Sequence, residues 1–325
     1  MRVLVVGAGA IGGYFGGRLL QAGRDVTFLV RPRRAAQLAS AGLVIKSPRG
    51  DLRLQAPPTI LSENIREAFD LVLLSCKAYD LAGAVDSFAA AIGPATLILP
   101  LLNGMRHLDA LDERFGASHV LGGLCIIAST LDAERSVVHL NDQDSLVFGV
   151  RDGAERDQAR SECVRGIENE LQNAGFDARL SGQIVQEMWE KWVLLAALAG
   201  VTCLMRAAIG DTVASPGGGP LILEMLDECA AIAAGEGFAP RAAFLDRARA
   251  ALTAKDSTLT ASMLRDLESN APVEADHVLG DLLRRRRGLA TSRAAPSPLS
   301  LAYTHLKAYE TRRARILAAA QHAGR

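Results

Sequence analysis

The 325-residue sequence predicts an α/β fold, in which a doubly wound sheet is followed by an all-helical C-terminal domain. The first half alternates short, continuously apolar runs with helical stretches, which is typical of parallel strands covered on both faces. From about residue 182 only helical patterns follow. We therefore expect two domains, residues 1–181 and 182–325, with a boundary near Leu180–Gly182.

Each element is expected from its own pattern. The expected strands are 2–7, 25–30, 70–76, 96–101 and 119–129, with a helix over 10–23. The segment "VVHLNDQDSLVFG" (137–149) is expected to place a polar turn between two strands that close the sheet with antiparallel pieces. The expected helices of the second half are 183–208, 219–235, 240–255, 258–269, 272–286 and 298–319, with loops at 215–220 and 287–298.

The composition excludes several classes of protein. The 36 basic and 36 acidic residues give a formal net charge of zero, which argues against nucleic acid or a membrane surface as a partner. The 5 cysteines are scattered without a CxxC pair, which disfavours disulfides or zinc and fits the cytoplasm. The N-terminus lacks a signal-peptide pattern, and the apolar stretch Val193–Met205 is shorter than the roughly 20 residues of a membrane span. We expect that stretch to be a buried core helix.

Two polar runs have ordinary structural explanations. The arginines of "LLRRRRG" (282–288) are expected to close a helix that Gly288 caps. The carboxylates of "NDQDS" (141–145) have a metal-like spacing, but a hairpin turn explains them. No metal site is therefore expected.

The N-terminal segment "VLVVGAGAIGGYFGGRL" carries Gly7-x-Gly9-x-x-Gly12 directly after a strand and at the start of a helix. Gly7 permits a tight turn, Gly9 lets a pyrophosphate approach the backbone, and Gly12 lets helix and strand pack closely. This context indicates a Rossmann-type dinucleotide site, and the alternative is a glycine-rich turn without a ligand. The expected cofactor contacts are Gly7, Ala8, Gly9, Ala10, Ile11 and Gly12.

The end of the second strand indicates which cofactor binds. An NAD enzyme usually places Asp or Glu there, whereas this chain has "FLVRPRR", with Arg31 at that position and Arg33 and Arg34 nearby. A guanidinium binds a 2′-phosphate that a carboxylate would repel. We infer NADPH over NADH; the alternative is that these arginines only solvate the start of the next helix.

Several motifs then line up along the chain, namely "GAGAIGGYFGGRL", "LVRPRR", "LLSCKAYD", "LLNGM", "MWEKW" and "ASMLRDLESNAPVEADHVLGDLL". Their order and spacing resemble the ketopantoate reductase (2-dehydropantoate 2-reductase) family over essentially the whole chain. Members of that family use NADPH to reduce ketopantoate to D-pantoate, on the route to pantothenate and coenzyme A. The resemblance implies a Rossmann domain followed by a helical, substrate-binding domain.

The resemblance also implies roles for individual residues. Lys77 and Asn103 would lie at strand ends and contact the cofactor near the nicotinamide, with Ala128 a weaker candidate. For the cofactor, the alternative at Asn103-Gly104 is a plain turn.

On the substrate side, Lys191 resembles the catalytic lysine of the family, and both it and Asn103 would contact the substrate. Ser262 would bind the substrate carboxylate, and Asp266 would support that motif. Glu274 would act in catalysis by hydrogen-bonding substrate hydroxyl and carbonyl groups; as the alternative, it only complements the dipole of the helix that begins after Pro272.

The chain departs from the family pattern at three places. Family members usually carry Asn one and two helical turns after the lysine, where this chain has Leu195 and Ala199. A further Asn of the family corresponds to a position near Ile209 and is also absent from this chain. Thr202 still fits the pattern. A site without those amides should favour a 2-oxo acid with fewer hydroxyl groups.

Lys191 also suits the chemistry of carbonyl reduction. Hydride that arrives at a carbonyl carbon leaves an alkoxide, which needs a positive proton donor close by. The flanking Trp189 and Trp192 indicate a partly enclosed helix start, whereas the alternative is an ordinary exposed pair with Glu187.

The sequence therefore predicts NADPH-dependent reduction of a small 2-oxo acid, with ketopantoate as the first candidate. Two alternatives stay open: a related reductase of another 2-oxo acid, and an NADPH-binding protein without turnover. The apolar C-terminal helices favour a homodimer.

Overall fold

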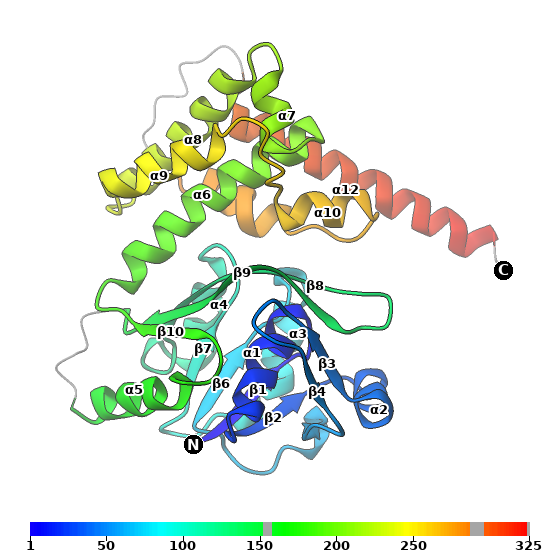
Figure 1. Cartoon of the computed structure of the whole chain (residues 1–325), viewed down its shortest axis with the longest axis vertical. Helices are drawn as coiled ribbons and strands as arrows, with labels where there is room; N and C mark the ends of the chain where they lie inside the picture. Colours follow the sequence, from blue (N-terminus) through cyan, green and yellow to red (C-terminus); the bar gives the residue numbers. More distant parts are fainter. Residues whose placement is uncertain (152–157, 287–295, 324–325) are drawn as a thin grey trace. The chain divides into compact units, whose positions relative to one another are not determined.

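The structure is a computed structural model that describes residues 1–151, 158–286 and 296–323 (Figure 1). The chain forms two compact units. Unit 1 comprises Met1–Leu102 and His107–Val185, and unit 2 comprises Asn103–Arg106 and Gln186–Arg325. The predicted fold class is confirmed, because unit 1 is built on a parallel sheet and the rest of the chain is helical.

The first sheet of unit 1 is parallel throughout and has the strand order β5-β2-β1-β6-β7. Its predicted strands are present, whereas the short β5 was not predicted. The side chains of β1, β6 and β7 are almost wholly buried, as expected for strands covered on both faces. The strands are β1 (Arg2–Val6), β2 (Asp25–Leu29), β5 (Thr59–Ile60), β6 (Leu71–Leu74) and β7 (Leu97–Pro100).

A second sheet of unit 1, with the order β10-β9-β3-β4 and with β8 paired to β9, corrects two predictions. The apolar run 119–129 was expected to be a parallel strand, but β8 (Gly122–Leu131) pairs antiparallel with β9. The segment 137–149 holds no turn and forms one strand, β9 (Val137–Gly149). The other strands are β3 (Leu43–Lys46), β4 (Leu52–Leu54) and β10 (Asp177–Leu180), none of them predicted.

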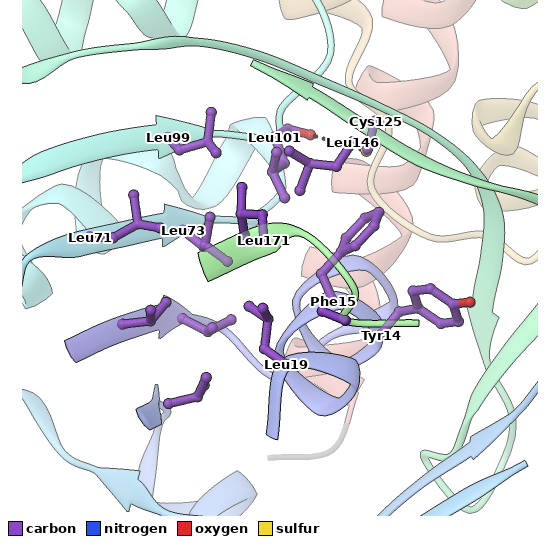
Figure 2. Packing of buried hydrophobic residues seen from close by; sticks show 14 of the residues in the cluster. Tyr14, Phe15, Leu19, Leu71, Leu73, Leu99, Leu101, Cys125, Leu146 and Leu171 are labelled. Atoms are coloured by element: carbon purple, nitrogen blue, oxygen red, sulfur yellow. Dashed lines mark hydrogen bonds between the residues drawn. The ribbon is translucent and has the colours of Figure 1, made fainter. Parts of the chain in front are cut away.

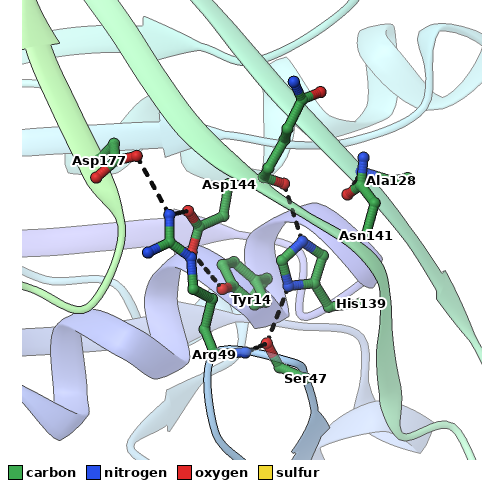
Figure 3. Close-up of polar contacts among 9 residues, drawn as sticks. Tyr14, Ser47, Arg49, Ala128, His139, Asn141, Asp144 and Asp177 are labelled. Atoms are coloured by element: carbon green, nitrogen blue, oxygen red, sulfur yellow. Dashed lines mark hydrogen bonds and ion pairs between the residues drawn. The ribbon is translucent and has the colours of Figure 1, made fainter.

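The polar residues of β9 predicted a turn, but one of them is buried against partners from elsewhere in the chain (Figure 3). Asp144 is 1% exposed. Its Oδ2 accepts a hydrogen bond from the Tyr14 hydroxyl at 2.7 Å, and its Oδ1 accepts one from Arg49 at 3.0 Å. A carboxylate with both oxygens satisfied can lie inside a sheet at little cost, so "NDQDS" continues the strand.

Helix α1 (Ala10–Gln21) packs against both sheets through two pairs of glycines. A Cβ on Gly12 or Gly16 would approach Val5 of β1 to 3.1 Å. A Cβ on Gly13 would lie 2.9 Å from Val137, and one on Gly17 would lie 2.7 Å from Ile45, both in the second sheet. The helix buries its large side chains among the core leucines, as Figure 2 shows.

Further helices complete unit 1. The α-helices are α2 (Pro32–Ala41), α3 (Leu81–Phe88), α4 (Arg106–Phe115) and α5 (Gln158–Leu171). The 3-10 helices are η1 (Ser62–Asn64), η2 (Ala78–Asp80), η3 (Ala89–Ala91) and η4 (Ala117–His119).

Unit 2 contains the predicted helices with changed limits. Helix α7 was not predicted, the loop expected at 215–220 is partly helical because α8 begins at Gly218, and the helix expected over 272–286 divides into a π-helix and a short α-helix. The helices are α6 (Ile184–Met205), α7 (Ile209–Ala214), α8 (Gly218–Gly235), α9 (Ala242–Leu252), α10 (Ser262–Glu268), η6 (Asp276–Gly280), α11 (Asp281–Arg284) and α12 (Pro298–Ala323).

Two sequence features of unit 2 are explained by packing. Helix α6 is long and apolar enough to cross a membrane, but 67% of its most apolar window is buried in the protein, as in a core helix. In the basic run, Arg284 and Arg285 pair with Asp281, and Arg286 pairs with Glu228. The helix ends at Arg284, and the predicted cap Gly288 lies outside the described residues.

Candidate functional site

The glycine loop between β1 and α1 fits a dinucleotide. Gly7 has a φ of +93°, in the left-handed region that favours glycine. A Cβ on Gly12 would lie 2.1 Å from the carbonyl oxygen of Gly7 and 2.2 Å from Ser75 Oγ, so only glycine permits this approach. Around Gly9 no atom of the described residues lies within 4 Å of an added Cβ, and no side chain there caps the helix. The open backbone and the positive end of the helix dipole suit a pyrophosphate.

The loop lies at the point where the strand order of the first sheet reverses. From β1 the chain passes to β2 on one side, and later to β6 on the other side of β1. Ser75, just after β6, donates from Oγ to the Val6 carbonyl at 3.0 Å and thereby joins the two strand ends. Ligands of doubly wound sheets bind at the carboxyl ends of strands at such a point.

The three arginines after β2 differ in their surroundings. Arg31 directly precedes α2, its side chain is 80% exposed, and its Nη2 lies 3.0 Å from Asp80 Oδ1. Arg34 is half-buried and donates from Nε and Nη2 to the Ala8 carbonyl at 3.2 and 2.9 Å. Burial, and secondarily Arg135, lowers the pKa of Arg34. Arg34 thus supports the glycine loop, while Arg31 and the exposed Arg33 face solvent.

Two further predicted cofactor contacts also lie in unit 1. Lys77 follows β6 and directly precedes η2, where its carbonyl accepts the N–H of Asp80 at 2.9 Å. Ala128 lies at an irregularity of β8, and its N–H donates to Asn141 Oδ1 at 3.3 Å (Figure 3).

In unit 2 the structure brings Lys191 and Asn103 together. Lys191 is a half-buried residue of α6, and its Nζ donates to Asn103 Oδ1 at 3.1 Å, across 88 positions of sequence. Trp189 and Trp192 are 2% and 1% exposed, which agrees with the enclosed helix start expected from the sequence. Lys191 is therefore held by an amide oxygen, which orients an ammonium group without neutralising it.

Ser262 and Asp266 lie one turn apart on α10, and both are partly buried. The preceding Ala261 donates its N–H to Thr202 Oγ1 at 3.4 Å, while Thr202 itself is fully buried and donates to the Leu198 carbonyl at 2.7 Å. Thr202 of α6 thus fixes the start of the helix that carries Ser262.

Glu274 was expected in the first turn of a helix, but it lies just before η6. Its carbonyl oxygen accepts the N–H groups of His277 at 3.2 Å and Val278 at 3.0 Å, which leads the chain into the π-turn. Burial lowers the pKa of the His277 imidazole, and the charge of the half-buried Glu274 side chain opposes that effect.

The positions that depart from the family pattern are not equivalent. Ala199 is 1% exposed and Ile209 is fully buried, so both belong to the packed core of unit 2. Leu195 is half-buried, one helical turn after Lys191. Of the three, Leu195 has the side chain that can face a bound molecule.

Asn103 lies in the Asn-Gly turn that the sequence left open as an alternative, and sequence reasoning missed its neighbour His277. Gly104 has a φ of +74°, and the ring of His277 is hydrogen-bonded to the backbone of Asn103. The Asn-Gly dipeptide is a signal for such a turn. The only sequence cue for His277 is its place three residues after Glu274.

Comparison with known proteins agrees with this geometry. A family model described as "Ketopantoate reductase PanE/ApbA" matches residues 3–153, and one described as "Ketopantoate reductase PanE/ApbA C terminal" matches residues 183–310. The uncharacterised oxidoreductase YkpB of Bacillus subtilis is 36% identical over 310 residues, which cover 95% of this chain and 99% of that protein.

Solved structures have the same fold. The crystal structure of 2-dehydropantoate 2-reductase from Geobacter metallireducens matches with a TM-score of 0.82 and 25% identity, covering 95% of this chain and 99% of that one. The ternary structure of D-mandelate dehydrogenase with NADH and anilino(oxo)acetate matches with a TM-score of 0.83, covering 96% and 99%. At 20% identity, the second likeness is one of fold alone.

Proposed function

The chain belongs to the ketopantoate reductase family of oxidoreductases, and from that premise we propose that it reduces a small 2-oxo acid with NADPH. The first candidate substrate is ketopantoate, whose reduction gives D-pantoate for pantothenate and coenzyme A synthesis. The observation that carries the proposal is the 3.1 Å hydrogen bond from Lys191 Nζ to Asn103 Oδ1. It presents an oriented ammonium group on a partly enclosed helix start.

In this proposal the cofactor is held by the glycine loop of unit 1. Gly7 and Gly12 shape the turn, the backbone at Gly9 is open for the pyrophosphate, and Arg31 offers its exposed guanidinium to the 2′-phosphate. An exposed ion pair such as Arg31–Asp80 contributes about 0–1 kcal/mol, so Asp80 would not prevent that contact. Lys77 and Ala128 stay proposed contacts. When bound, NADPH would supply the hydride.

Lys191 is the proposed proton donor to the oxygen that becomes the hydroxyl of the product. Asn103 Oδ1 accepts one N–H of the ammonium and so directs the other two. A positive donor near the developing alkoxide stabilises the transition state more than the ground state. Ser262 would bind the substrate carboxylate with support from Asp266, and Glu274 would hydrogen-bond the hydroxyl or carbonyl group.

A second candidate is a reductase of another 2-oxo acid. Its support is Leu195, the half-buried residue one turn after Lys191, because an apolar side chain there supplies no hydrogen bond to a hydroxylated substrate. The fold is also that of D-mandelate dehydrogenase, which was solved with NADH and anilino(oxo)acetate. An apolar 2-oxo acid is therefore a specific rival to ketopantoate.

We also propose that the protein acts in the cytoplasm and forms a homodimer. Helix α12 supports the dimer, because Leu301, Ile316 and Leu317 are 45%, 52% and 42% exposed. Light scattering of the purified protein measures its mass, and a monomer at micromolar concentration would refute the dimer.

One assay tests the function itself. NADPH oxidation is followed with ketopantoate, branched aliphatic 2-oxo acids and an aromatic 2-oxo acid, and then with NADH in place of NADPH. Turnover of ketopantoate with the highest kcat/KM supports the first candidate, and turnover of an apolar acid supports the second. NADPH binding without turnover of any acid would leave a cofactor-binding protein and refute a reductase.

A further inference from the structure

The Asn103-Gly104 turn is held by one element of unit 2. A Cβ on Gly104 would lie 2.9 Å from the carbonyl oxygen of His277 and 3.1 Å from its ring Cδ2. The same ring is hydrogen-bonded to the Asn103 backbone, and His277 is only 6% exposed. The imidazole and the backbone of residue 277 therefore enclose the turn on one side.

That element is the π-helix η6 (Asp276–Gly280), which also fixes the neighbour of Lys191. The carbonyl of Val278 accepts a hydrogen bond from Trp192 Nε1 at 2.9 Å, and Trp192 directly follows Lys191. A π-turn inserts an extra residue into a helix, and such turns are frequent at functional sites. Consecutive residues of one π-turn thus hold the backbone of Asn103 and the helix that carries Lys191.

We propose that His277 is a positioning residue, which holds Asn103 so that its side-chain oxygen orients the Lys191 ammonium group. The inference rests on the proposed role of Lys191 as proton donor. His277 touches neither reactant in this scheme and acts through Asn103 alone.

The charge state of His277 agrees with this role. Burial lowers the pKa of the imidazole, and Arg106 lowers it further, against the opposing effects of Glu274, Asp281 and the Asn103 backbone. The ring is therefore neutral near pH 7 and adds no second positive charge beside the ammonium group.

The test is a double-mutant cycle on kcat, with NADPH and the best 2-oxo acid of the panel. His277→Phe keeps a planar ring but removes both ring nitrogens, and we expect kcat to fall about 10- to 100-fold, because a small misplacement of a catalytic group has that cost. NADPH affinity, measured by fluorescence, should stay unchanged. His277→Gln, which restores a side-chain donor and acceptor, should recover part of the loss.

The double variant gives the decisive comparison. Because His277 acts through Asn103 on Lys191, His277→Phe combined with Lys191→Ala should be no slower than Lys191→Ala alone. The inference would be overturned, with the role of Lys191 intact, if the losses in kcat of the two single variants multiplied in the double variant. Wild-type kcat in a folded His277→Phe protein would overturn it as well. Full turnover in Lys191→Ala would instead refute the proposed proton donor and this inference with it.

A second substitution tests the turn if His277→Phe does not fold. Gly104→Ala pushes a methyl group against His277, while Gly23→Ala has the same backbone strain, at a φ of +76°, with no atom of the described residues within 4 Å. We expect kcat of Gly104→Ala to be at least tenfold below that of Gly23→Ala. Equal kcat values in the two variants would contradict the inference.

Discussion

The two units build their candidate sites from different materials. In unit 1 the glycine loop is mainly backbone: its shape requires glycine at Gly7 and Gly12, and the absence of a side chain at Gly9 leaves it open. In unit 2 the Lys191–Asn103 pair consists of side chains that are 88 positions apart and are aligned by a π-turn. A backbone site is thus damaged by adding atoms, whereas a side-chain site is damaged by removing or moving them.

The largest expected effect comes from removing the proton donor of unit 2. Lys191→Ala should lower kcat by about 10²–10⁴-fold, the usual contribution of a positioned general acid, which corresponds to roughly 3–5 kcal/mol of barrier. NADPH affinity and melting temperature should stay nearly unchanged, because the glycine loop belongs to unit 1. Steady-state kinetics, cofactor titration and thermal melting measure the three quantities.

Two control variants sharpen that result. Lys191→Arg should not restore kcat, because a guanidinium does not readily release a proton. Glu187→Ala should keep wild-type kcat. If Lys191→Ala turned over normally and lost under about 1 kcal/mol of stability, the lysine would be only a surface partner.

The next effect concerns the cofactor side of unit 1. Arg31→Asp should weaken NADPH by about 10- to 100-fold, because a hydrogen bond to a charged group contributes about 1.5–3 kcal/mol, while NADH affinity should change little. Fluorescence titration with both cofactors measures this. Arg33→Asp makes the same charge change two residues away and serves as the control. Equal affinity of the wild type for NADPH and NADH would refute the NADPH preference.

Alanine substitutions should have different effects at Gly12 and Gly9 of the loop. Gly12→Ala forces a methyl group against the Gly7 carbonyl and should cost about 1–3 kcal/mol of folding stability, as overpacking does, together with NADPH affinity. Gly9→Ala meets open space, so its melting temperature should match the wild type while NADPH affinity falls. A Gly9→Ala protein that binds NADPH normally would show that no pyrophosphate approaches that residue.

The smallest effect concerns substrate choice in unit 2. Leu195→Asn restores one amide beside Lys191 and should raise kcat/KM for ketopantoate by about two- to tenfold, since a net hydrogen bond contributes about 0.5–1.5 kcal/mol. Ala199→Asn is the contrasting variant, because residue 199 is buried and the larger side chain should lower stability instead. A wild-type protein that already reduces ketopantoate with a micromolar KM would show that other residues replace the missing amides.

The same contrast explains what could be predicted from the sequence. The parallel strands and the glycine loop follow from local residue spacing, so both could be predicted from the sequence. The continuous strand β9 could not be predicted, because the residues next to Asp144 in sequence do not indicate its distant partners Tyr14 and Arg49. In unit 2 the flanking tryptophans and the family resemblance pointed to Lys191, but its contact with Asn103 depends on tertiary packing and was not predicted. The π-turn has no local signature, and so His277 was missed.

The assignment of Asn103–Arg106 to unit 2 has a consequence for how such proteins can be recombined. These four residues are flanked on both sides by unit 1, so unit 2 is encoded by two separate stretches of sequence. A chimera that fused residues 186–325 to another nucleotide-binding domain would transplant Lys191 and His277 but leave Asn103 behind. The exchange would succeed only if the recipient carried Asn-Gly at the corresponding position. The two units are therefore poor candidates for independent shuffling, and we expect them to be inherited as a pair.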